Sequence, residues 1–260
     1  MEKHMRKFLL ALILAFVMVF AAACGDNNDG GGDAPPAATG AEWDAVIDAT
    51  VARLNAENPN YNAKERVEFE SEYMGESWWE EDTYSLDGNK LFCQFEDSRN
   101  HNSRHYYELY EEGYCYKYIT DYSYNNGMTL PDGKEYFKVK MQEGSGVGRF
   151  YPRAVDIGEF KGAYKFFEYK NGKYVLKEDK VNDLAVEILG FSEEDGFLLG
   201  MEVSFQISGG LVAEFILGYE YEFGGYEAVK ITTSLQYGGV TVTLPSDGIC
   251  EFADETVTEG

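Results

Sequence analysis

The sequence predicts an α+β protein: a strongly curved antiparallel β-sheet, or half-barrel, with an N-terminal amphipathic helix packed on its concave face. Three observations support this prediction. Apolar residues recur at helical spacing over 42–58, and several later segments alternate apolar and polar residues with period two. Asn-Gly, Asp-Gly and Gly-Gly pairs separate these segments, and such pairs suit the tight hairpins of antiparallel strands.

The helix is predicted from one apolar face. Its apolar positions follow one another at steps of three and four residues, so they share one side of a helix and need a partner surface. They are Trp43, Val46, Ile47, Thr50, Val51 and Leu54. A second, shorter helical stretch is expected within 153–163.

The strands are predicted from alternation. Val67 and Phe69 face one way while Glu68 and Glu70 face the other, which is typical of a strand with one solvated face. The pattern returns in 202–208 and again in 231–244, where it continues past Gly238-Gly239. We expect nine to eleven strands in all. The segment 211–223 is long for one strand and therefore indicates strong curvature; its inward side is predicted to hold Leu211, Ala213, Phe215, Leu217, Tyr219, Tyr221 and Phe223.

The N-terminus has the layout of a secretory signal. Lys3, Arg6 and Lys7 precede an apolar run over 8–20, and three alanines lead to Cys24. The run is shorter than the ~20 residues that a membrane-spanning helix needs. The layout resembles the lipobox of bacterial lipoproteins, in which the matching cysteine receives a diacylglyceryl group and becomes the new N-terminus. The alternatives are an ordinary cleaved signal with an incidental cysteine, or an uncleaved anchor.

The first forty residues therefore divide into a signal peptide, 1–23, and a disordered Gly/Asp/Pro tether, 24–40. The tether contains too few apolar side chains to order itself. Residues 41–260 follow as a single β-rich domain, with no internal linker. We expect a protein on the extracytoplasmic face of the cell membrane, held by the lipid on Cys24, because two acyl chains give a stable anchor.

Composition excludes some functions. The net charge of −24 repels nucleic acid, so no nucleic-acid partner is expected. The sequence contains no G-x-S-x-G, H-E-x-x-H, G-x-G-x-x-G or Walker-type motif. His101 and His105 are four residues apart, a spacing that suits a metal on a helix, but they are expected in a polar turn. We therefore predict no enzyme activity, no catalytic residues, no metal and no cofactor.

The cysteines of the domain are expected to be free. Cys93 and Cys115 fall in strands separated by one further strand, which in a meander places them about 9–10 Å apart, beyond disulfide reach. A bridge between them stays possible if the strand order differs. Cys250 then acts, like the other two, as a small apolar residue.

The order of segments also resembles a known family. The starting helix, "YKFFEYKNGKYVLK", "EDGFLLGMEVSF" and "VKITTSLQYGGVTVTLP" together resemble the half-barrel lipoproteins of the LolA/LppX-like superfamily. The resemblance implies a carrier or sensor that holds a lipid, acyl chain or other hydrophobic small molecule between sheet and helix. The residues that it implies as ligand contacts are Trp43, Ile47, Val51, Phe205, Phe215 and Leu235. The same residues could instead close a dry core.

A second functional hypothesis comes from the aromatic residues, which make 15% of the chain. Trp78 and Trp79 are adjacent, so in a strand they point to opposite faces. Exposed Tyr and Trp side chains favour recognition, because they combine a broad apolar surface with a polar group. The alternative function is therefore a surface adhesion or envelope-scaffold module that recognises a glycan or a protein. The sequence does not indicate an oligomeric state.

Overall fold

The computed structural model describes residues 35–72, 74–99, 103–111, 113–120, 129–142, 157–190, 198–222 and 225–254. Outside these ranges lie the signal peptide, most of the tether, Cys24, His101 and Phe223. The predictions made for them therefore stay predictions.

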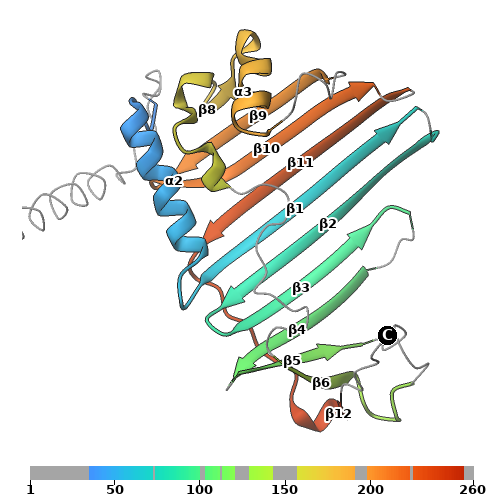
Figure 1. Cartoon of the computed structure of the whole chain (residues 1–260). Coiled ribbons are helices and arrows are strands. Elements are labelled where there is room, and N and C mark those ends of the chain that lie inside the picture. The colour runs from blue at the N-terminus through green and yellow to red at the C-terminus, as the bar shows by residue number, and fades with distance from the viewer. Residues whose placement is uncertain are drawn as a thin grey trace, which may run out of the picture.

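Most of the structure is one large, open, curved sheet (Figure 1). Twelve strands are described, more than the nine to eleven expected, and their order is β12-β6-β5-β4-β3-β2-β1-β11-β10-β9-β8-β7. All neighbours are antiparallel except β12 and β6, which are parallel. The strands are β1 (Asn60–Ser71), β2 (Glu76–Asp87), β3 (Lys90–Asp97), β4 (Ser103–Glu111), β5 (Tyr114–Ile119), β6 (Tyr136–Gln142), β7 (Phe167–Lys170), β8 (Lys173–Leu176), β9 (Leu198–Ser208), β10 (Leu211–Glu222), β11 (Tyr226–Tyr237) and β12 (Cys250–Asp254).

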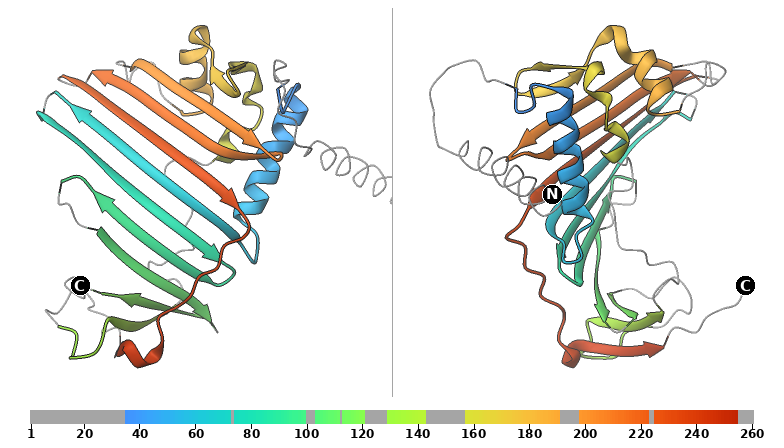
Figure 2. Two further views of the ribbon diagram at one scale, coloured as in Figure 1. Left: turned by 180° about the vertical axis from the view of Figure 1, so that it is seen from behind. Right: turned by 60° about the vertical axis from the view of Figure 1, so that its left-hand side comes forward.

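The sheet consists of two runs of sequential strands joined at its centre. β1 to β6 form one antiparallel run, and β7 to β11 form the other. The two runs meet where β1 pairs with β11, with Val67 opposite Ile231. Segment 238–249 then leaves β11 and crosses the sheet on the side that faces the viewer in Figure 2 (left), which places β12 beside β6.

The helices are few. α2 (Gly40–Leu54) confirms the predicted N-terminal helix, and the Thr39 hydroxyl caps it by accepting from the Glu42 N–H. Residues 157–163, the described part of the second predicted helical stretch, hold only 3₁₀ turns: η1 (Ile157–Phe160) and the start of η2 (Ala163–Phe166). α3 (Val181–Glu187), which was not predicted, follows η3 (Glu178–Lys180), and η5 (Asp247–Ile249) precedes β12.

α2 packs against one side of the sheet, which we call the helix side. Trp43 is fully buried, and its ring lies 5.1 Å from that of Phe205 on β9 and 5.2 Å from that of Phe167 on β7. At the other end of the helix, the Thr50 hydroxyl accepts a hydrogen bond from the Val212 N–H on β10 (3.0 Å). These contacts fix α2 at the β7–β10 end of the sheet. That it fills a concave face stays a prediction.

The folded body begins before residue 41. Ala37, which composition assigns to the tether, is fully buried, and its N–H donates to the Tyr174 hydroxyl (2.7 Å). The Tyr174 hydroxyl in turn donates to the Ala37 carbonyl. This reciprocal pair attaches the end of the tether to β8.

Two alternation patterns are corrected. β10 contains a bulge between Val212 and Glu214, so Val212 and Phe215 are both buried, and the inward side does not continue through Ala213 to Leu211. After β11 the alternation continues without a strand. Val240 and Val242 are buried there, and the backbone N–H of each donates to a side chain of the sheet, Asn60 Oδ1 and Asp87 Oδ2.

Candidate functional site

The six residues expected to contact an apolar ligand do lie together. They pack against one another and against neighbouring side chains. Trp43, Ile47, Phe205, Phe215 and Leu235 are buried in one cluster, and Val51 packs against its edge. The Phe205 and Phe215 rings lie 4.6 Å apart, and the Trp43 indole N–H donates to the Phe160 carbonyl (2.8 Å). In this conformation the side chains themselves occupy the space between helix and sheet.

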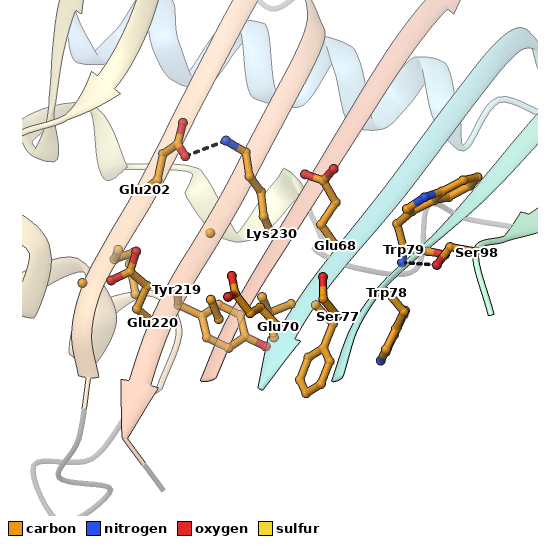
Figure 3. Close-up of a pocket in the computed structure, with 16 residues that line it drawn as sticks. Glu68, Glu70, Ser77, Trp78, Trp79, Ser98, Glu202, Tyr219, Glu220 and Lys230 are labelled. Carbon is orange, nitrogen blue, oxygen red and sulfur yellow. Dashed lines mark hydrogen bonds and ion pairs between the residues drawn. The ribbon is translucent and has the colours of Figure 1, made fainter. Parts of the chain in front are cut away.

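A groove of about 930 Å³ lies elsewhere, over the centre of the sheet (Figure 3). Its principal side chains belong to the side opposite α2, which we call the open side. One row of residues crosses five adjacent strands, each residue directly opposite the next. This row is Glu202, Gly218, Lys230, Glu68 and Trp79.

A second row lies two residues further along the strands. It consists of Gly200, Glu220, Ala228, Glu70 and Ser77, again directly opposite one another. Gly200, Gly218 and Ala228 have little or no side chain, so they leave the floor of the groove low between the longer glutamates. The groove therefore results from small residues at matching register on neighbouring strands.

The charged groups of the first row are paired. Lys230 Nζ lies 2.8 Å from Glu202 Oε2, and Gly218 occupies the strand position between them. Arg66 Nε lies 3.0 Å from Glu68 Oε1, and the Arg66 guanidinium stacks over the Trp79 ring, 4.4 Å from its centroid. Glutamates of this row therefore already bind cationic side chains of the same protein, Lys230 and Arg66.

The second row is different. Within the described part of the chain, neither Glu70 nor Glu220 takes part in an ion pair. Both carboxylates act on Tyr226: partial loss of hydration, followed by Glu220 and Glu70, raises the pKa of its hydroxyl. The groove thus carries an excess of negative charge around Ala228.

Trp78 and Trp79 point to opposite sides of the sheet, as the sequence predicts. Trp79 is opposite Glu68 on the open side, and Trp78 is opposite Phe69, with ring centroids 5.2 Å apart. The Arg99 guanidinium lies 4.2 Å from the Trp78 ring centroid, and its Nη2 is 3.5 Å from Glu80 Oε2. Each tryptophan therefore contacts an arginine that also pairs with a glutamate.

His105 was expected in a turn, and this expectation is wrong. It lies in β4, where Nε2 is 3.1 Å from the Tyr136 hydroxyl, because register places its ring beside aromatic neighbours on β3 and β6. No group of three His, Cys, Asp or Glu side chains among the described residues is placed to hold a metal ion. In the same part of the chain, no helix is long and apolar enough to cross a membrane.

The cysteine prediction is confirmed for three residues. Cys93, Cys115 and Cys250 form no disulfide and are buried. β4 separates β3 from β5, as the predicted meander requires.

The fold and the groove define a β-rich protein built on a single curved sheet, with a groove on the side that α2 leaves open. No family model matches the chain, and no curated protein is similar to it. Among solved structures, a DUF1329 family protein from Desulfovibrio piger is similar at 11% identity and a TM-score of 0.26. The match covers 79% of this chain and 95% of that one. At so low a TM-score, no property of that protein is transferred to this one.

Proposed function

We propose that this chain is a lipid-anchored, extracytoplasmic binding protein that recognises a glycan or protein partner through its open-side groove and performs no catalysis. One observation carries the proposal: the groove combines an aromatic ring, Trp79, with a floor of small residues and with two carboxylates, Glu70 and Glu220, that form no ion pair among the described residues. Aromatic faces and carboxylates are groups that bind polar partners with both apolar area and hydrogen bonds. The anchor is proposed from the sequence around Cys24.

The anchor is tested by replacing Cys24 with serine in the full chain. The wild-type protein should stay with the membrane fraction and carry the mass of a diacylglyceryl group, whereas Cys24→Ser should lack that mass. If wild-type protein carries no added lipid mass, the anchor is wrong.

Recognition is tested by filling the groove. Ala228 lies on the floor between Glu220 and Glu70, so Ala228→Tyr should occupy the groove and abolish binding to envelope glycan or protein fractions. Thr232→Tyr is the matched control, because Thr232 is on the same side of β11, four residues away and outside the groove. Equal binding by both variants would refute the groove as the recognition site.

A second candidate is a carrier or sensor of a lipid or other apolar ligand. The supporting observation concerns the contact between α2 and strands β7 to β10, which we call the α2 seam. It is lined mostly by apolar and aromatic side chains, so a helix displaced from it would expose the Phe205 and Phe215 rings. We propose it as the alternative. Native mass spectrometry of the mature chain tests it: a bound lipid that Phe205→Ala removes supports the carrier, and a ligand-free mass in repeated preparations rejects it.

A further inference from the structure

The acidic residues of the open side form two parallel columns. On β1 the column consists of Glu68 and Glu70, and on β10 it consists of Glu220 and Glu222. Each is paired with β11, which lies between them, so the columns are two strand spacings apart, or about 10 Å. β11 places Ala228 and Tyr226 between these columns, so the columns border a channel along β11.

The spacing along each column matches an extended peptide. Successive glutamates in a column are two residues apart on a strand, which is about 6.5–7 Å. In an extended peptide, side chains that face the same way recur at that distance. A peptide lying along β11 would therefore present every second side chain to the carboxylates.

The charge of the channel favours a cation. Among the residues that the structure describes, Glu70, Glu220 and Glu222 form no ion pair, whereas Glu68, at one end of the channel, is paired with Arg66. Lys230 contributes a second positive charge at that same end. Lys230 is already paired with Glu202. The chain as a whole carries a net charge of −24, which attracts cationic partners over a distance.

The chain itself shows how such a cation can be held. The Arg66 guanidinium lies over the Trp79 ring and between two carboxylates, 3.0 Å from Glu68 and 3.7 Å from Glu81. Guanidinium and ammonium groups both bind to this combination of aromatic face and carboxylate. Glu70, one row further along β1, offers the same charge without an arginine of its own.

We propose that the channel along β11 binds an extended basic segment of a partner protein, with lysine or arginine at alternate positions. This inference rests on the proposed function, because it names the partner of the same groove. The backbone of the segment lies over Ala228, and its cationic side chains reach the glutamates on β1 and β10.

The test uses the mature full chain and a fluorescein-labelled peptide of five Lys-Ser repeats, followed by fluorescence anisotropy at low salt. We expect Glu70→Gln combined with Glu220→Gln to weaken binding about fivefold or more, which corresponds to losing two exposed charge pairs. The matched control is Glu168→Gln combined with Glu178→Gln, which removes the same charge from exposed positions on β7 and η3 and should change binding less than twofold. Equal weakening in both double variants would show attraction by net charge alone and overturn the inference.

Two further measurements identify the kind of ligand that the channel binds. A peptide of five lysines followed by five serines has the same composition, and we expect it to bind more weakly because its spacing does not follow the columns. If it binds as well as the alternating peptide, or if spermine competes at equal charge concentration, the extended peptide is the wrong occupant. If no peptide binds while Ala228→Tyr still abolishes envelope binding that Thr232→Tyr retains, this inference fails and the proposed function stands.

Discussion

Replacing Trp43 tests whether the α2 seam is a packed core. The side chain is 0% exposed, and its ring contacts Phe167, Tyr174 and Phe205 at centroid distances of 5.1–5.2 Å. Truncating a buried tryptophan to alanine costs about 3–5 kcal/mol, and the Phe160 carbonyl left without its donor adds about 1 kcal/mol. Trp43→Ala should therefore lower the free energy of unfolding by about 4–6 kcal/mol.

This loss is large beside the total stability of an ordinary domain, about 5–15 kcal/mol. It should appear in urea unfolding of the mature chain followed by far-UV circular dichroism, and as a fall in Tm of about 10–20 °C. The control is Leu199→Ala, because Leu199 on β9 is 56% exposed and its loss should cost less than about 0.5 kcal/mol. A Trp43→Ala loss below about 2 kcal/mol would refute the packed seam.

Three further predictions concern single interactions. Thr50→Val leaves the Val212 N–H unpaired and should cost about 1–3 kcal/mol in urea unfolding, while Thr50→Ser should recover most of it; equal losses would contradict this. Burial raises the pKa of Cys93 from 9.0 to about 11, so its contribution to stability is complete below pH 9 and is lost as pH rises through 11. Unfolding at pH 8 and pH 11 should show a fall about 2–3 kcal/mol larger in wild type than in Cys93→Ala, and identical falls would refute the assignment. Gly172 follows Asn171 in the β7–β8 turn with φ 81°, so Gly172→Ala should cost about 1 kcal/mol by thermal melting, whereas Asn171→Gly should be nearly neutral.

Local patterns predicted the elements well where a single periodicity governs burial. The four buried residues of α2, including Trp43 and Thr50, all belong to the predicted apolar face. Alternation likewise predicted that Phe205 faces inward and that Trp78 and Trp79 point to opposite sides of the sheet. These features depend only on backbone geometry and on one buried face, so the sequence alone is sufficient.

These local patterns did not predict which strands pair with one another, or in which register. The groove depends on Gly218, Lys230 and Glu68 standing opposite one another, and these residues come from strands whose register is set by the whole sheet. The bulge after Val212 moved the inward side of β10 by one residue, which no local signal in the sequence predicts. Val240 and Val242 follow the alternation of a strand because both are buried. Their backbone N–H groups, however, donate to side chains instead of to a neighbouring strand.

The central pairing of β1 with β11 has a consequence for folding during synthesis. Residues 60–71 are synthesised long before 226–237, so one edge of β1 has no strand to pair with until some 150 further residues have been added. A bare strand edge of this length can associate with other unfolded chains, and such distant partners also slow the closure of the sheet. We expect this polypeptide to need a holding chaperone during its biogenesis.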